Sequence, residues 1–230
     1  MPQLSVRLSA IAALVPNGAR VCDIGTDHGY LAIELMRSGV ASWVIATDIG
    51  EKPLENARKN LEVSGVESVE LRLCDGLSGI SPNEVDTVII AGMGGEVISG
   101  ILKRGEKVAA RQNVTVILQP TTSPEALREF LCEEGYEILK EAAVFENGKL
   151  YSVMLVKFTG SILKLDPAYY YAGKVTPETK AGLLYIEKQR NRCYKCMRAL
   201  ENVPTKKDEY DNYKSAFEGL ENILGEFGEN

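Results

Sequence analysis

DIGTDHGYL, at residues 23–31, is the stretch from which the fold can be inferred. It follows a short apolar run, Arg20–Ile24, and leads into a helix-like run, Leu31–Met36. A strand that turns into a helix through glycines is the opening unit of an open α/β sheet, and such sheets bind ligands outside the carboxyl ends of their strands. We therefore expect residues 23–31 to begin a ligand-binding crevice.

Strand-like and helix-like segments alternate through residues 1–160. Strands are predicted at Trp43–Thr47, Val69–Leu73, Thr87–Ala91, Thr115–Gln119 and Leu150–Lys157. Helices are predicted up to about Pro16, at Pro53–Ser64, and after Ser123, which we expect to cap a helix that starts at Pro124. This alternation predicts an α/β fold with a Rossmann-like, doubly wound, mostly parallel sheet. A hairpin across Glu146-Asn147-Gly148-Lys149 predicts an antiparallel edge.

The pattern changes after Gly160, which divides the chain into predicted domains 1–160 and 161–230. Two runs of apolar residues at helical spacing flank the loop Asn202–Asp208. The members of the two stripes are Leu183, Ile186, Cys193, Met197 and Leu200, then Tyr213, Phe217, Leu220, Ile223 or Leu224, and Phe227. Such stripes predict a C-terminal α-helical coiled-coil hairpin.

Composition limits the class of protein. The 230 residues carry a net charge of -6, and no apolar run approaches the roughly 18 residues of a membrane span. The N-terminus has no basic leader, and the cysteines are scattered and odd in number, so we expect a cytoplasmic protein that is not bound to a membrane. Cys193-x-x-Cys196 has no second pair of ligands and His28 is the only histidine, so no metal is expected.

The opening turn is acidic, which bears on the ligand. Asp23 and Asp27 flank Gly25, and Gly29 follows, whereas a dinucleotide loop usually reads G-x-G-x-x-G. Two carboxylates repel a pyrophosphate and attract an ammonium or sulfonium group. The turn therefore favours S-adenosyl-L-methionine over NAD as the cofactor.

Three further strand ends carry acidic or glycine-rich turns. Asp48 ends the second strand in ATDI (residues 46–49), at the offset of a ribose-binding carboxylate. Asp75 lies in CDGL (residues 74–77), where it can accept an exocyclic adenine amine, although Asp-Gly alone is often just a turn. AGMGGE (residues 91–96) exposes backbone beside Met93, and Gln119-Pro120 ends the fifth strand. With the opening turn, four strand ends carry such turns, and we expect them to share one edge of the sheet with Gln119-Pro120.

Taken in order, DIGTDHGYL, ATDI, CDGL, IIAGMGGEVI and ILQP resemble the bacterial tRNA (adenine-22-N1)-methyltransferase family, TrmK. The resemblance runs from Leu4-Ser5-x-Arg7-Leu8 to the helical tail. It implies a class I methyltransferase domain, with S-adenosyl-L-methionine as cofactor and S-adenosyl-L-homocysteine as product, and a C-terminal helical pair that helps to hold tRNA. The implied cofactor-binding residues are Asp23, Gly25, His28, Gly29, Asp48, Ile49, Asp75, Gly76, Gly92 and Met93. Thr121 departs from the asparagine expected after Gln119-Pro120.

The resemblance also implies the reaction, transfer of a methyl group to N1 of adenine 22 in tRNA. Asp27 is our candidate catalytic residue, because a carboxylate stabilises the cationic ring that forms; the alternative is a structural hydrogen bond within the turn. His28 is expected to hydrogen-bond either ligand. The expected substrate-binding residues are Arg7, Gly94, Gln119 and Tyr151, with the locally basic face Lys188, Arg190, Arg192 and Lys195. We expect that face to neutralise phosphates of the tRNA; the alternative is that it is an ordinary solvent-exposed helix face.

Three other functions compete with this one. The chain could be a class I methyltransferase for a different RNA or a small molecule, an NAD-dependent oxidoreductase, or a non-catalytic RNA-binding module that uses the helical arm alone. The basic arm disfavours a small-molecule or protein substrate for the methyltransferase, and the acidic opening turn disfavours the oxidoreductase. Cofactor-dependent turnover would separate the third from an enzyme.

Overall fold

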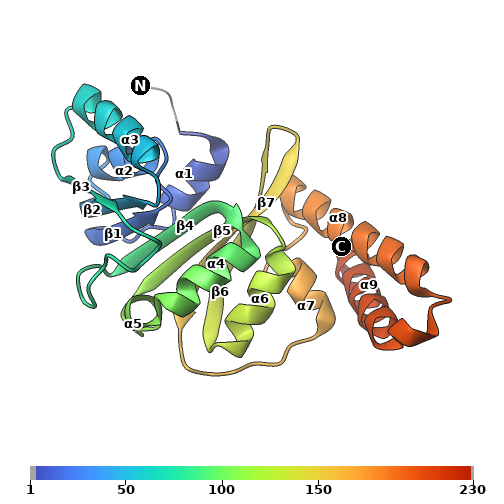
Figure 1. Ribbon diagram of the computed structural model, residues 1–230. Coiled ribbons are helices and arrows are strands. Elements are labelled where there is room, and N and C mark those ends of the chain that lie inside the picture. Colours follow the sequence, from blue (N-terminus) through green and yellow to red (C-terminus); the bar gives the residue numbers. More distant parts are fainter. Residues whose placement is uncertain (1–3, 229–230) are drawn as a thin grey trace.

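The computed structural model describes residues 4–228, and its centre is one seven-stranded sheet with the order β3-β2-β1-β4-β5-β7-β6 (Figure 1). The strands are β1 (Ala19–Ile24), β2 (Ala41–Asp48), β3 (Val69–Leu73), β4 (Thr87–Gly94), β5 (Thr115–Thr122), β6 (Tyr136–Glu146) and β7 (Lys149–Phe158). β1 to β5 pair in parallel, and β7 runs antiparallel to both β5 and β6. The predicted doubly wound sheet with an antiparallel edge is confirmed.

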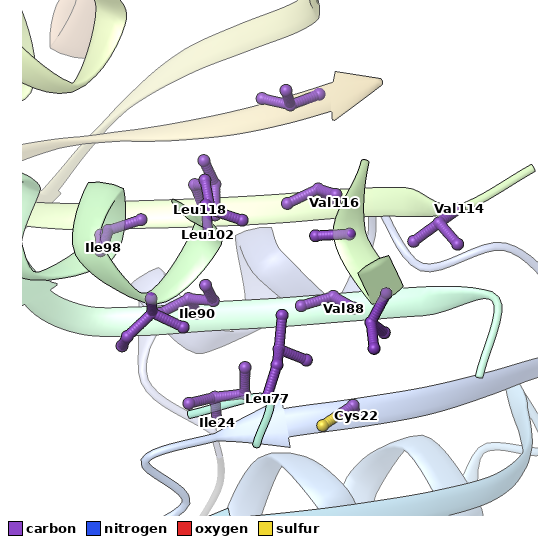
Figure 2. Close-up of a cluster of buried hydrophobic side chains, with 14 of the residues drawn as sticks. Cys22, Ile24, Leu77, Val88, Ile90, Ile98, Leu102, Val114, Val116 and Leu118 are labelled. Carbon is purple, nitrogen blue, oxygen red and sulfur yellow. The ribbon is translucent and has the colours of Figure 1, made fainter. Parts of the chain in front are cut away.

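Helices cover both faces of the sheet. One face packs against α1 (Val6–Ala12) and α2 (Tyr30–Arg37), with α3 (Glu51–Ser64) beside them. The other packs against α4 (Gly95–Arg104), α5 (Glu106–Ala109) and α6 (Pro124–Glu133). Figure 2 shows the core under α4, where side chains from alternate positions of β1, β4 and β5 meet Ile98 and Leu102. Because side chains alternate along a strand, the residues between them supply the core of the opposite face.

The connection into α6 differs from the prediction in one respect. Ser123 occupies the N-cap position before Pro124, but its side chain makes no capping hydrogen bond. Its φ of 49° is left-handed, and its carbonyl oxygen would lie 2.3 Å from a Cβ added at Gly95. The predicted N-cap position and the helix start at Pro124 are confirmed, but the side-chain hydrogen bond is not formed, because tight packing against the start of α4 sets the backbone at Ser123.

The C-terminal segment is helical, with α7 (Pro167–Ala172), α8 (Lys180–Leu200), a 3-10 turn (Pro204–Lys206) and α9 (Lys207–Gly228). α8 and α9 fold back on one another beside β7 (Figure 1), and Cys193 of α8 shares a core with Leu220 of α9. The predicted helical hairpin is confirmed. Two details differ from the predicted stripes. Phe227 is exposed, and α8 also buries Tyr185 and Gln189, because its first half packs on β6 and β7 as well as on α9.

A buried charged network ties this helical segment to the sheet. Arg128 of α6 and the side chain of Glu141 of β6 are both fully buried, with 2.6 Å between Arg128 Nη2 and Glu141 Oε1. Arg128 also donates to the carbonyls of Tyr170 (2.7 Å) and Tyr171 (3.0 Å) and to the Tyr185 hydroxyl (2.8 Å). Each guanidinium nitrogen thus has a partner, from the sheet, α7 or α8. We keep 1–160 and 161–230 as a proposed division of the chain, with this network across it.

Removing one partner from this network is expected to destabilise the protein strongly. Arg128→Met leaves the Glu141 carboxylate buried without its cation, and such losses cost about 3–5 kcal/mol of unfolding free energy. Urea unfolding of the wild type and the variant measures the loss. The double variant Arg128→Met, Glu141→Leu should recover part of it, because no charge then stays buried; Arg58→Met, on the exposed side of α3, is the control. Equal stability of Arg128→Met and wild type would contradict the argument.

Candidate active-site cleft

The acidic opening turn borders a cleft of about 330 Å³. Its walls come from the first turns of α1, from the β1–α2 turn and from the end of β4. β1 lies between β2 and β4, so the order of the strands reverses next to it. Open α/β sheets bind ligands at such a reversal, outside the carboxyl ends of the strands. The topology therefore places the predicted crevice at this cleft.

The backbone of the turn requires its glycines. Gly25 (φ 76°) and Gly29 (φ 69°) are left-handed, and so is Asp27 (φ 46°). The N–H groups of Gly25 and Thr26 donate to the Thr47 carbonyl at 2.8 and 3.0 Å, which folds the turn back onto β2. A Cβ added at Gly25 would lie 2.3 Å from the Met93 methyl group. The turn after β1 and the glycine-rich end of β4 are thus in direct contact.

Asp23 is a buried carboxylate without a cationic partner among the described residues. It is 5% exposed and accepts a 2.8 Å hydrogen bond from the Thr26 hydroxyl. Burial raises the pKa of Asp23 to about 6; the Thr26 hydrogen bond acts in the opposite direction, and the Asp48 charge adds to the rise. A carboxylate held in this way gains more than an exposed one from a cationic ligand. Sequence reasoning missed Thr26, whose only signal was its place between Asp23 and Asp27.

Asp27 and His28 form the outer rim of the cleft. Their side chains lie 3.4 Å apart (Asp27 Oδ2 to His28 Nε2), and both are substantially exposed. The His28 ring stacks on Tyr30 with 5.3 Å between ring centroids and 15° between planes. Asn60 holds the His28 carbonyl at 2.8 Å. The rim therefore offers a carboxylate next to a flat pair of aromatic rings.

The next two strand ends carry the other predicted cofactor residues. Asp48 accepts a 2.8 Å hydrogen bond from the Gly50 N–H, and Ile49 beside it is 77% exposed. Asp75 forms an exposed ion pair with Arg104 at 3.2 Å. Gly76 (φ 57°) packs so closely on Ile101 that an added Cβ would lie 2.9 Å from it. Asp48 and Asp75 thus extend the row of carboxylates that begins with Asp23 at the end of β1 to the ends of β2 and β3. We call this row the acidic edge.

Arg7 lines the cleft on the side of α1, and Gln119 holds Arg7 from beneath the surface. Gln119 is fully buried; its carbonyl oxygen accepts from Arg7 Nη1 and from the Gly92 N–H (3.1 Å), and its amide donates to the Pro120 carbonyl (2.7 Å). Its polar atoms are thus engaged within the protein, and Gln119 acts as an anchor for Arg7. The Arg7 guanidinium also lies over the Tyr151 ring, 5.8 Å from its centroid. Gly94 lies further along, against the Thr122 hydroxyl.

Glu146 is a further partner of Arg7, and sequence reasoning missed it. It lies in the segment predicted as a hairpin turn, and it accepts a 2.9 Å hydrogen bond from the Arg7 backbone N–H. A second contact, 3.5 Å, joins its other oxygen to Arg7 Nε. No sequence spacing links residues 7 and 146, so only the tertiary structure reveals the pair.

The predicted basic face of α8 is divided in two. Arg190 pairs with Glu221 of α9 at 2.6 Å, and Arg192 pairs with Glu125 of α6 at 2.6 Å and lies over the Tyr171 ring. Lys188 and Lys195 are exposed and have no ion pair within residues 4–228. The two arginines therefore hold α8 against its neighbours, while the charges of the two lysines are exposed to solvent.

Within residues 4–228, no three acidic, histidine or cysteine side chains come together in a group that could hold a metal ion. None of the helices in that same range combines the length and the apolar character needed to cross a bilayer.

A family model described as "Methyltransferase domain" matches residues 4–154. The chain is 38% identical over 157 residues to the tRNA (adenine(22)-N(1))-methyltransferase of Bacillus subtilis (strain 168). The aligned region covers 67% of this chain and 65% of that protein. The match thus spans just under two thirds of that relative.

Solved structures extend the likeness along the chain. The crystal structure of B. subtilis TrmK, an M1A22 tRNA methyltransferase, superposes with a TM-score of 0.82 at 28% identity, covering 96% of this chain and 99% of that one. A putative tRNA (m1A22) methyltransferase of Streptococcus pneumoniae, in complex with S-adenosyl-L-methionine, gives 0.77 at 32% identity, covering 94% and 100%. The likeness therefore includes the helical tail as well as the sheet.

The raised pKa of Asp23 predicts how stability depends on pH. The carboxyl keeps its proton in the folded state up to about pH 6 but loses it near 3.8 when unfolded, so its contribution to stability is present below about pH 4 and is lost as pH rises through 6. Between pH 7 and pH 4.5, the wild type should gain about 2 kcal/mol relative to Asp23→Asn. Urea unfolding of the ligand-free proteins at several pH values measures this difference.

Thr26→Val supplies a second variant for the same measurement. It removes the hydrogen bond that favours the ionised carboxylate, so the pH-dependent gain relative to Asp23→Asn should begin at higher pH than in the wild type. A difference between wild type and Asp23→Asn that stays constant over this range would show that Asp23 does not titrate as described.

Proposed function

We propose that this chain, which belongs to the tRNA (adenine(22)-N1)-methyltransferase family, TrmK, transfers a methyl group from S-adenosyl-L-methionine to N1 of adenine 22 in tRNA. The names of its relatives support the substrate, and the structure with bound S-adenosyl-L-methionine supports the cofactor. The observation in this chain that carries the proposal is Asp23, a buried carboxylate in a glycine turn whose pKa is raised to about 6. Such a group favours a cationic cofactor.

The acidic edge fits S-adenosyl-L-methionine along its length. We assign the cationic amino-acid part to the turn that holds Asp23 and Gly25, and the ribose hydroxyls to Asp48. The adenine falls beside exposed Ile49 and Asp75, which would share or release Arg104. Met93, packed on Gly25, closes the wall between cofactor and substrate. When bound, the cofactor supplies an electrophilic methyl group on sulfur.

The protein's part in the reaction is mainly to position the reactants. Adenine N1 is unprotonated at pH 7 and already nucleophilic, so alignment and exclusion of water provide most of the acceleration. The ring becomes cationic as the methyl group arrives. Asp27, on the rim with His28 as its neighbour, is the carboxylate we assign to stabilise that charge.

The target base must leave its pairing partner, since N1 lies on the Watson–Crick edge. Two aromatic surfaces, one lining the cleft and one under Arg7, suit an extruded base. One is the stacked pair His28 and Tyr30, and the other is Tyr151 beneath Arg7. Stacking of this kind contributes roughly 1–3 kcal/mol per base.

The helical arm is proposed to hold the body of the tRNA. Lys188 and Lys195 are its exposed cations without an ion pair in the described chain, while Arg190 and Arg192 keep α8 on its neighbours. Phosphate contacts from these lysines would make binding weaken with salt. An enzyme for tRNA is expected in the cytoplasm, and we propose that location.

Methylation of an unmodified tRNA transcript tests the proposal. With labelled S-adenosyl-L-methionine, we expect labelled 1-methyladenosine at position 22 and no transfer to a transcript with guanine there. Asp27→Asn should lower kcat by roughly 10–100-fold with little change in cofactor affinity, because it removes stabilisation that arises only in the transition state. Absence of labelled RNA, or retention of NAD in place of S-adenosyl-L-homocysteine, would refute the proposal.

Charge reversal of the two exposed lysines tests whether this part of the basic face binds tRNA. Lys188→Glu with Lys195→Glu should weaken tRNA binding about tenfold or more and flatten its salt dependence, with no change in cofactor affinity. Filter binding over a range of salt concentrations measures both effects. Lys59→Glu, on exposed α3, is the matched control. Unchanged tRNA affinity in the double variant would show that these lysines are exposed to solvent but do not contact tRNA.

A further inference from the structure

Glu146 lies at the tip of the β6–β7 hairpin, between the helical tail and the N-terminal helix. On one side of the tip, Ala143 and Leu150 pack into the core of α7, α8 and α9. On the other, the Glu146 carboxylate accepts the Arg7 N–H at 2.9 Å and lies 3.5 Å from Arg7 Nε. Its side chain is only 13% exposed. The hairpin thus supports the cleft wall that α1 forms.

The partner of Glu146 is the cation that lines the cleft. Arg7 borders the same cavity as Asp23 and Gly92, and a Cβ added at Gly92 would lie 3.5 Å from Arg7 Nη1. Its side chain is 23% exposed, held by Gln119 and Tyr151 as well as by Glu146. The arginine therefore cannot simply swing away into solvent.

A fixed arginine is unfavourable for the chemistry proposed for this cleft. The methyl donor carries a positive sulfonium, and the methylated adenine ring is also cationic. Like charges repel more strongly in a partly desolvated site than in water. An unneutralised Arg7 would therefore oppose cofactor binding and the developing charge on the base.

Glu146 supplies the missing negative charge. Its burial disfavours the charged form, but the Arg7 backbone hydrogen bond, the Ser5 hydroxyl and the Arg7 charge together hold the pKa of Glu146 below its usual value. The carboxylate is thus ionised at neutral pH and stays with the guanidinium. Arg7 keeps its remaining N–H donors without adding net positive charge to the cleft.

We propose that Glu146 is a positioning residue that neutralises Arg7, so that the cleft accepts both the cationic methyl donor and the cationic product while Arg7 acts as a hydrogen-bond donor to the target nucleotide. This inference rests on the proposed function. It gives a role in the reaction to the last residue of β6, which acts on the cleft through Arg7, a residue far from it in the sequence.

The test compares two ligands that differ in charge at sulfur. Glu146→Gln keeps a side-chain acceptor for the Arg7 N–H and loses only the charge. Calorimetric titration should show S-adenosyl-L-methionine binding weakened about tenfold and neutral-sulfur S-adenosyl-L-homocysteine by less than about threefold. Glu146→Asp should restore the ratio of the two affinities. The double variant Arg7→Met, Glu146→Gln should restore it as well, because the unneutralised cation is gone.

Turnover on tRNA provides the second readout. Glu146→Gln should lower kcat by about tenfold or more and change KM for tRNA by less than about threefold, since the missing charge matters most when the ring is cationic. Glu55→Gln, which breaks an exposed pair with Lys59 on α3, is the matched control and should change neither quantity. Thermal unfolding of all variants accompanies these measurements.

An unchanged ratio of the two cofactor affinities in Glu146→Gln would overturn the inference. So would an altered ratio that persists in the double variant, because the effect would then not pass through Arg7. The ratio needs no RNA. If the wild type failed to methylate tRNA, the proposed substrate would be wrong, and the ratio would still decide the role of Glu146.

Discussion

The buried ion pair between Arg128 and Glu141 is the constraint on which the arrangement of the molecule depends. Both side chains are fully buried, so each charge needs its partner and every remaining donor needs an acceptor. The acceptors come from α7 and α8, and Gly173 must be a glycine because a Cβ there would lie 1.8 Å from the Glu141 carboxylate. The helical tail supplies these acceptors to Arg128 only when it is docked on the sheet in the observed position.

That position also sets the walls of the cleft. α6, which carries Arg128, begins just beyond the end of β5, where Gln119 anchors Arg7. β6, which carries Glu141, ends at Glu146, which contacts Arg7 from the other side. Arg192 adds an ion pair from α8 to the first turn of α6. The arm proposed to hold tRNA and the cleft proposed to hold the base are therefore parts of one packed unit.

The β1–α2 turn lowers the stability of the folded state, whereas the packed cores raise it. Asp23 is ionised at neutral pH at a cost, because burial raises its pKa to about 6. Left-handed residues in the same turn add backbone strain at Asp27. Large cores on both faces of the sheet offset these costs. Such local costs concentrate at binding sites, where a ligand relieves them.

The sequence alone determined the sheet, its antiparallel edge, the helical hairpin and the acidic strand ends, because each follows from local periodicity and turn chemistry. Local patterns could not show that Ser123 at the N-cap lacks a side-chain capping hydrogen bond, or that α8 buries Tyr185 and Gln189, since neighbours distant in sequence decide both. The same holds for Glu146 beside Arg7 and Glu141 beside Arg128. Only the tertiary structure pairs these charges, because a long-range ion pair leaves no periodic trace in the chain.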